Sequence, residues 1–99
     1  MAHTILPLTE QIVLVTGGAR GLGAAITRAF LAQGARVVIN YHTSQEAAED
    51  LAAGHPGQAI AVRADVRDRS QVDALVVEAA DRFGSPITTV VNNVGCPRK

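Results

Sequence analysis

The sequence predicts an α/β fold, a doubly wound parallel sheet of four strands in the order 3-2-1-4 with three helices. Short apolar runs alternate with segments of helical periodicity from one end of the chain to the other. The runs are apolar on both faces, as strands buried between two layers of helices are. Four glycines separate the first run from the first helical segment. The alternation implies right-handed crossovers, so successive strands are expected to run parallel.

The first strand and the first helix flank these glycines. Gln11–Thr16, which reads QIVLVT, is short, apolar and rich in β-branched residues, and this predicts a buried strand. A helix is predicted over Leu22–Gln33, and Gly34 supplies its stop signal. Apolar residues at helical spacing predict its buried face: Leu22, Ala25, Ile26, Ala29 and Phe30.

The second strand and helix follow the same pattern. Arg36–Asn40 is an apolar run that predicts a buried strand, and a helix is predicted over Gln45–Ala53. Thr43 and Glu46 have the spacing of a capping box, in which each side chain bonds the other residue's backbone N–H. The pair therefore marks the beginning of this helix, and Gly54 marks its end.

A third strand is predicted over Ala59–Ala64, after the turn signal His-Pro-Gly at 55–57. Ser70 and Asp73 resemble a second capping box, and the helix behind them is predicted over Gln71–Phe83, with Gly84 as its stop. Its apolar stripe is Val72, Leu75, Val76, Ala79, Ala80 and Phe83.

The fourth strand is predicted over Ile87–Asn92. It would form an edge of the sheet and carries the apolar residues Ile87, Val90 and Val91. Because an open apolar edge invites pairing with another chain, we expect self-association, or pairing with a partner, through this strand.

Composition excludes several classes of function. The 99 residues are 47% hydrophobic and 18% charged, with nine basic and nine acidic residues, so no basic surface is expected for nucleic acid or a membrane. The chain shows neither a signal-peptide pattern nor a membrane-spanning run, and has one cysteine, Cys96, so we expect a cytoplasmic protein. The histidines His3, His42 and His55 share no metal-ligand spacing with one another or with Cys96, so no metal site is predicted.

The glycine-rich stretch Thr16–Gly23 reads TGGARGLG and lies between the first strand and the first helix. Backbone N–H groups at a helix start favour an anion there. The stretch matches neither the G-x-G-x-x-G spacing nor a P-loop. A tight turn alone would normally need one glycine, so the four glycines indicate a ligand that approaches the backbone.

Four motifs in order resemble the short-chain dehydrogenases/reductases. The glycine stretch is similar to the family's T-G-x-x-x-G-x-G, and Ala64–Val66 (ADV) to its adenine contact. Asn92–Gly95 (NNVG) resembles the family's N-N-A-G and departs from it at Val94. Val37–Ser44 (VVINYHTS) most resembles the branch of 3-oxoacyl-(acyl-carrier-protein) reductases. The resemblance extends from about Gln11 to Gly95 and implies a Rossmann-type fold that binds a dinucleotide.

The resemblance also implies roles for individual residues. Gly17, Gly21 and Gly23 would let the backbone approach the pyrophosphate. Asp65 would accept a hydrogen bond from the adenine amino group beside the Val66 backbone, although it could simply cap a turn. Asn92 would order the backbone near the cofactor ribose, or would only form a turn. The full predicted cofactor site is Gly17, Gly18, Arg20, Gly21, Leu22, Gly23, Asn40, Tyr41, Asp65, Val66 and Asn92.

The end of the second strand favours NADP over NAD. NAD sites usually place an acidic residue about 20 residues beyond the first glycine, on the ribose 2′-hydroxyl. Here Asn40 and Tyr41 stand at that place, and no acid precedes Glu46. A carboxylate would repel a 2′-phosphate, whereas the Arg20 guanidinium suits one. The alternative for Arg20 is a solvated surface arginine. NAD-using relatives can carry the same arginine, so Arg20 alone does not decide between the two cofactors.

The family's proton-donating Tyr-x-x-x-Lys pair does not occur in these 99 residues. Tyr41 is the one tyrosine and is followed four residues later by Gln45, and Lys99 is the one lysine. No catalytic residue is therefore predicted, and we expect the chain alone to be inactive. The predicted organisation is a lead over residues 1–10 and a truncated Rossmann domain over 11–99. Three interpretations stay open: part of a reductase, a stand-alone nucleotide-binding module, or a partner that pairs with a full-length enzyme.

Overall fold

The computed structural model describes residues 7–93, and the predictions made for His3, Val94, Gly95, Cys96 and Lys99 lie outside them. The predicted elements and their order are confirmed, with a short 3-10 helix at Leu8–Glu10 in addition. The strands and helices are β1 (Ile12–Val15), α1 (Gly21–Ala32), β2 (Arg36–Tyr41), α2 (Gln45–Ala53), β3 (Ala59–Arg63), α3 (Arg69–Phe83) and β4 (Thr89–Val91).

The four strands form one parallel sheet in the predicted order β3-β2-β1-β4. Val13 of β1 is paired with Val37 of β2 on one side and with Thr89 of β4 on the other. On the far side of β2, Tyr41 is paired with Arg63 at the end of β3. Because all strands point the same way, their carboxyl ends meet at one edge of the sheet, where the glycine-rich turn also lies.

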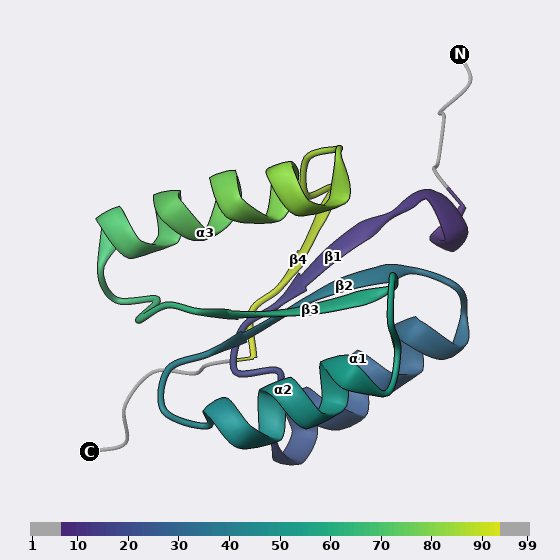
Figure 1. Ribbon diagram of the computed structural model, residues 1–99, viewed down its shortest axis with the longest axis horizontal. Coiled ribbons are helices and arrows are strands. Elements are labelled where there is room, and N and C mark those ends of the chain that lie inside the picture. Colours follow the sequence, from purple (N-terminus) through teal and green to yellow (C-terminus); the bar gives the residue numbers. More distant parts are fainter. Residues whose placement is uncertain (1–6, 94–99) are drawn as a thin grey trace.

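The helices cover the two faces of the sheet unequally (Figure 1). α1 and α2 lie together on one face, and α3 lies alone on the other. Alternate residues of β1 serve the two layers: Val13 and Val15 belong to the core under α1 and α2, whereas Ile12 and Leu14 belong to the core under α3. This two-layer burial explains why the strands are apolar on both faces.

The face under the single helix is the less well covered one. Three large apolar side chains on this side of the fold are exposed: Val76 and Val77 on α3, and Val90 on β4. β4 is paired with β1 on one side and forms an edge of the sheet among the described residues. None of the helices in this part of the chain is long and apolar enough to cross a bilayer.

The predicted buried face of α1 is wrong. Leu22 is 70% exposed, and the residues that α1 buries are Gly23, Ala24, Thr27 and Leu31. The helix is turned so that its smallest residues face the glycine-rich turn, where the backbones come too close for a larger side chain. Ile26 and Phe30 of the predicted stripe are partly buried against the same core.

Both predicted capping boxes are also wrong. α2 begins after Ser44, not Thr43, and the Ser44 side chain makes no capping hydrogen bond. α3 begins two residues earlier than predicted, because the Asp68 side chain accepts a hydrogen bond from the Ser70 backbone N–H and serves as the N-cap. The predicted stop at Gly84 is confirmed, with a left-handed φ of 77°.

Candidate functional site

The carboxyl ends of the strands border an open cavity of about 720 Å³. It extends from the glycine-rich turn to the loop after β3 and along the flank of α3. The cavity has both polar and apolar lining residues. The polar set, with the glycine, is Thr16, Gly17, Asn40, His42, Asp65, Arg67 and Asn92, and the apolar set is Leu14, Ala64, Val66, Val72, Leu75, Val76 and Val90. The cavity therefore gathers residues from all four strand ends.

Two glycines of the turn adopt backbone conformations that other residues rarely adopt. Gly17 has a φ of 59° and Gly21 a φ of 55°. A Cβ atom at Gly21 would meet no atom of residues 7–93 within 4 Å, apart from its chain neighbours. Within the described part of the chain, the space before the first turn of α1 is therefore open to a ligand that approaches the backbone.

Gly23 is needed for a different reason, the close approach of α1 to the turn. A Cβ atom there would collide with the Gly17 carbonyl oxygen and would lie 2.8 Å from the Asn93 side-chain nitrogen. The N-cap residue Arg20 makes no side-chain cap, so the first backbone N–H groups of α1 have no capping acceptor among residues 7–93. These donors and the positive end of the helix face the open side of the turn and favour an anion.

Asn40 ties the glycine-rich turn to the loop after β3. Its side-chain oxygen accepts a hydrogen bond from the Gly17 backbone N–H at 3.1 Å, and its side-chain nitrogen donates to the Ala64 carbonyl at 3.0 Å. The Asn40 carbonyl also accepts from the Gly18 N–H at 3.0 Å. Only 2% of the Asn40 surface is exposed, so a buried side chain holds the glycine-rich turn and the loop after β3 in place.

Thr16 and Asn93 close the turn on the β4 side, and neither belongs to the cofactor site that the sequence predicts. The Thr16 hydroxyl accepts a hydrogen bond from the Asn93 backbone N–H at 2.8 Å and donates toward Asn92 Oδ1 at 3.1 Å. Asn93 Nδ2 donates to the Gly17 carbonyl at 3.2 Å. A polar residue at the last position of a buried apolar strand was the signal that could have identified Thr16.

Asp65 and Val66 follow β3 and line the cavity beside His42. The Asp65 carboxylate is held by Arg67 through two side-chain contacts of 3.0 Å, and His42 Nε2 lies 3.9 Å from Asp65 Oδ2. The hydrogen bond from the Arg67 side chain, followed by that from its backbone N–H, lowers the pKa of Asp65 to about 2. Asp65 is therefore an ionised acceptor at neutral pH.

This pKa gives a prediction for acid unfolding. Because the folded pKa lies below the ordinary 3.8, the unfolded chain binds more protons between these values, and stability falls as the pH drops from about 3.8 to 2. Asp65→Asn removes this contribution, so its free energy of unfolding should depend less steeply on pH over that range. Urea unfolding at a series of acidic pH values measures both slopes, and equal slopes would contradict the assignment.

Arg20, Tyr41 and Leu22 lie away from the large cavity. Arg20 is exposed, forms no ion pair within the described part of the chain, and lines a hollow of about 100 Å³ with Tyr41, His42 and Ser44. The Tyr41 side chain is mostly buried in the core under α1 and α2. Leu22 points into solvent, so only its backbone is placed to serve the turn.

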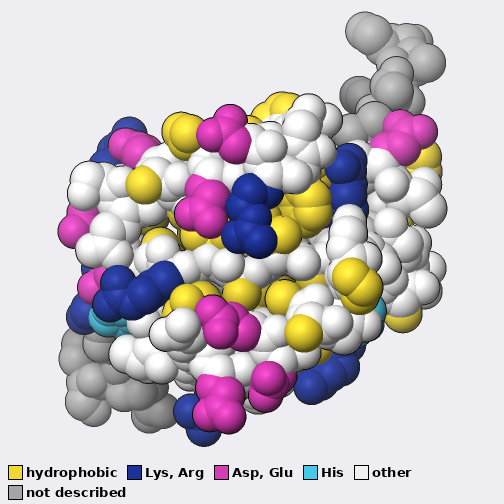
Figure 2. Space-filling view, viewed as in Figure 1, with side chains coloured by type: hydrophobic (Ala, Val, Ile, Leu, Met, Phe, Trp, Pro, Cys, Tyr) yellow, Lys and Arg dark blue, Asp and Glu magenta, His cyan; other side chains and the backbone are white. Residues whose placement is uncertain are grey.

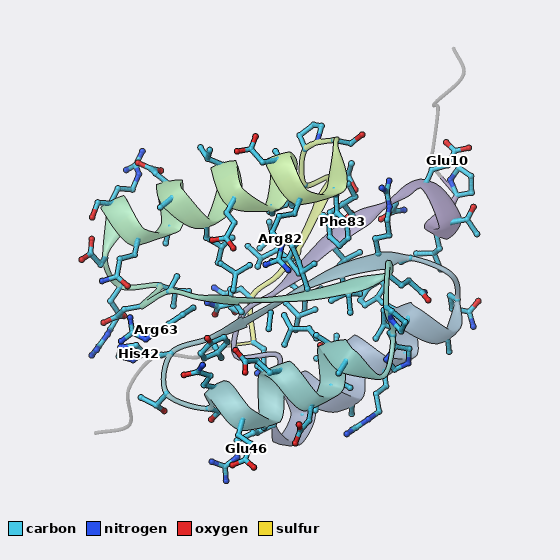
Figure 3. The ribbon with its side chains drawn as sticks, viewed as in Figure 1. Glu10, His42, Glu46, Arg63, Arg82 and Phe83 are labelled. Carbon is cyan, nitrogen blue, oxygen red and sulfur yellow. The ribbon has the colours of Figure 1, made fainter. Side chains whose placement is uncertain are left out.

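His42 and Arg63 lie at one end of the molecule (Figure 3). Figure 3 shows His42 and Arg63 close to each other where β2 and β3 end. In Figure 2 basic and histidine side chains lie side by side at the same end. Among residues 7–93 no three His, Cys, Asp or Glu side chains come together as metal ligands. The site can therefore bind an anion at the glycine-rich turn. Beside Asp65 it can bind a ligand ring that carries a hydrogen-bond donor.

The parallel order β3-β2-β1-β4, with a glycine-rich turn after β1, defines a Rossmann-type α/β fold. The short chain dehydrogenase family matches residues 11–99. The chain belongs to this family, which uses NAD or NADP as its cofactor.

Two relatives show how much of such a protein the chain represents. It is 44% identical over 94 residues to a 3-oxoacyl-[acyl-carrier-protein] reductase of Synechocystis sp., covering 92% of this chain and 38% of the relative. It is also 44% identical over 98 residues to an L-rhamnose 1-dehydrogenase (NAD(P)(+)) of Azotobacter vinelandii, covering 91% and 38%. The chain thus spans less than half the length of these relatives and corresponds to their N-terminal part.

Solved structures agree with the fold. A short chain dehydrogenase from Bacillus anthracis superposes with a TM-score of 0.81 at 31% identity, over 93% of this chain and 39% of that one. The FolM alternative dihydrofolate reductase 1 from Brucella canis, solved in complex with NADP, gives a TM-score of 0.80 at 35% identity, over 91% and 36%.

Proposed function

We propose that the chain is the NADP(H)-binding portion of a short-chain dehydrogenase/reductase-type oxidoreductase that reduces carbonyl or 3-oxoacyl groups. The observation that carries the proposal is the open glycine-rich turn at the start of α1, with a cavity beside it that extends to Asp65. The turn would receive the pyrophosphate, and Asp65 and Val66 the adenine. Bound NADPH would supply the hydride. The proposed domain covers residues 11–99 and acts in the cytoplasm.

The residues present fit a dinucleotide at both ends of this cavity. The uncapped N–H groups of α1 can bind the phosphates, with Gly17, Gly21 and Gly23 keeping side chains out of the way. Asn92, exposed at the end of β4, would lie near a ribose. The family's Tyr-x-x-x-Lys pair does not occur in this sequence, so these residues bind and orient the cofactor, and none of them is assigned to proton transfer.

Arg20 supports the choice of NADP over NAD. Its guanidinium is exposed beside the hollow lined by the residues after β2, and it has no acidic partner within residues 7–93. The ribose 2′-phosphate of NADP is a dianion that such a guanidinium can bind through two parallel hydrogen bonds. Among residues 7–93, no carboxylate lines this hollow to repel it.

Titration calorimetry with NADPH and NADH tests this assignment. We expect NADPH to bind more tightly than NADH. Arg20→Ala should reduce the difference between their binding free energies by roughly 1–3 kcal/mol, as for the loss of a charge-assisted hydrogen bond. Arg28→Ala, an exposed arginine on the same helix that lines a different hollow, is the matched control and should leave the difference unchanged. Equal affinities in the unaltered chain would refute the phosphate-binding role of Arg20.

The β4 edge favours a second candidate role, pairing with another chain. β4 has one neighbouring strand among the described residues, and its Val90 side chain is 60% exposed. Self-association, or pairing with a full-length reductase, would cover this apolar edge. A chain that pairs in this way but binds no dinucleotide would favour this role over cofactor binding.

A further inference from the structure

Arg67 forms a two-pronged contact with its near neighbour Asp65. Arg67 Nε donates to Asp65 Oδ1 and Nη2 donates to Oδ2, each at 3.0 Å, and the Arg67 backbone N–H donates to Oδ1 at 3.0 Å. The Asp65 side chain is 20% exposed, whereas that of Arg67 is 77% exposed. An exposed arginine thus holds a more buried carboxylate in one orientation, and both side chains line the large cavity.

The main chain of Asp65 is fixed as well. Its backbone N–H donates to Gln71 Oε1 at 2.8 Å, and its carbonyl accepts from the Asp68 N–H at 2.9 Å. Each carboxylate oxygen can accept two hydrogen bonds. Oδ1 accepts two from Arg67, whereas Oδ2 accepts one, and a second side-chain nitrogen, His42 Nε2, is 3.9 Å from Oδ2. Oδ2 can therefore accept one further hydrogen bond from a ligand.

Val66, the next residue along the chain, supplies a backbone donor. Its backbone N–H makes no hydrogen bond to any of residues 7–93, and the residue lines the cavity. A 6-aminopurine presents an amino donor beside a ring-nitrogen acceptor, which complements the Asp65 and Val66 pair. A 6-oxopurine presents an acceptor beside a ring N–H donor, so both contacts are reversed, and its oxygen faces the carboxylate.

We propose that Arg67 is a positioning residue that makes the cavity select a 6-aminopurine over a 6-oxopurine, by fixing the free acceptor of Asp65 next to the Val66 N–H. The proposal rests on the proposed function, because it concerns the base of the same dinucleotide. Arg67 acts through Asp65 and does not itself contact the base.

The experiment compares NADPH with its hypoxanthine analogue, which differs at the 6-position of the purine. Calorimetry on the unaltered chain should give roughly 10- to 100-fold tighter binding of NADPH, because a hydrogen bond to a charged group is lost and an unfavourable contact takes its place. In Arg67→Met the ratio should fall about threefold or more, because the carboxylate is free to rotate. Arg67→Lys keeps the positive charge but lacks the two parallel N–H donors of the guanidinium. Its affinity ratio should therefore lie between those of Arg67→Met and the unaltered chain.

Two further measurements separate this role from a general structural one. Arg69→Met removes an exposed arginine two residues away, which pairs with Asp73 at 3.7 Å, and should leave the base preference unchanged. In Arg67→Met the pKa of Asp65, followed by NMR of its carboxyl carbon, should rise from about 2 toward 3.8. Arg67→Met should not alter the preference for NADPH over NADH, because that preference reports on the 2′-phosphate.

The outcomes distinguish the two proposals. A chain that binds neither NADPH nor NADH refutes the proposed function and this inference together. A chain that binds NADPH but shows the same base preference with and without Arg67, or no preference at all, refutes this inference and leaves the proposed function standing. A reduced preference in Arg67→Met, with partial recovery in Arg67→Lys and none of this effect in Arg69→Met, supports it.

Discussion

Gly23→Ala should lower the free energy of unfolding by about 2–3 kcal/mol, since an added methyl group is forced against the backbone of a packed turn. Alanine is otherwise the better helix former by about 1 kcal/mol, so the loss arises from the collision alone. The atom in the way is the Gly17 carbonyl oxygen, which belongs to the main chain and has no rotamer in which to avoid the new Cβ. α1 must therefore move away from the turn, and dinucleotide affinity should fall as well.

Gly54→Ala provides the matched control. Gly54 has a φ of −73°, and a Cβ there would meet its nearest protein atom at 3.6 Å, an ordinary contact. This substitution should leave the free energy of unfolding unchanged or raise it by about 0.4–1 kcal/mol, because alanine lowers the conformational entropy of the unfolded chain. Urea unfolding of both variants measures the contrast. Equal stability of the two variants would show that the close approach at Gly23 is not a constraint.

Asn40→Leu should lower the free energy of unfolding by an amount similar to that for Gly23→Ala, but through lost hydrogen bonds. The substitution keeps the size of the side chain but removes the acceptor for the Gly17 N–H and the donor to the Ala64 carbonyl. Each buried backbone group left without a partner costs about 1–3 kcal/mol. The glycine-rich turn and the loop after β3 would then lose their common support, so both stability and dinucleotide affinity should fall.

Amide hydrogen exchange tests this with an internal control. The Gly17 N–H, which is bonded to the Asn40 side chain, should exchange faster in the variant. The neighbouring Gly18 N–H is bonded to the Asn40 main-chain carbonyl, which leucine retains, so it should keep more of its protection. Loss of protection at both amides alike would mean that the substitution unfolds the whole turn and not one hydrogen bond.

The number, type and order of the elements could be predicted because hydrophobic periodicity is a local property of the chain. The sheet order followed from the alternation of strands and helices. The ends were less certain: β4 was predicted over Ile87–Asn92 and is observed over Thr89–Val91. An edge strand with one neighbour forms fewer ladder hydrogen bonds, and apolar residues alone do not show where pairing stops.

The roles of individual side chains were harder to predict because they depend on contacts between distant segments. The sequence predicts Asn40 as a cofactor contact, and in the structure its side chain is buried and bonded to the Gly17 N–H and the Ala64 carbonyl. The face of α1 was misjudged because hydrophobicity ranks Leu22 above Gly23, whereas a close backbone approach requires the smaller residue. Arg67 is a different case, because its partner Asp65 lies only two residues away, and this spacing alone does not show that the arginine side chain folds back onto the carboxylate.

The bonds between Thr16 and Asn93 have a consequence for the order of folding. They join residues 77 positions apart, and the Ile12 N–H is bonded to Thr88 across 76 positions, whereas the contacts within each strand-helix-strand unit are far more local. Closing so long a loop costs chain entropy before any contact compensates, so we expect β4 to dock late. The glycine-rich turn is complete only after that step. A ligand that requires the complete turn would bind the docked state alone and would stabilise it by mass action, so its binding would be coupled to the last step of folding.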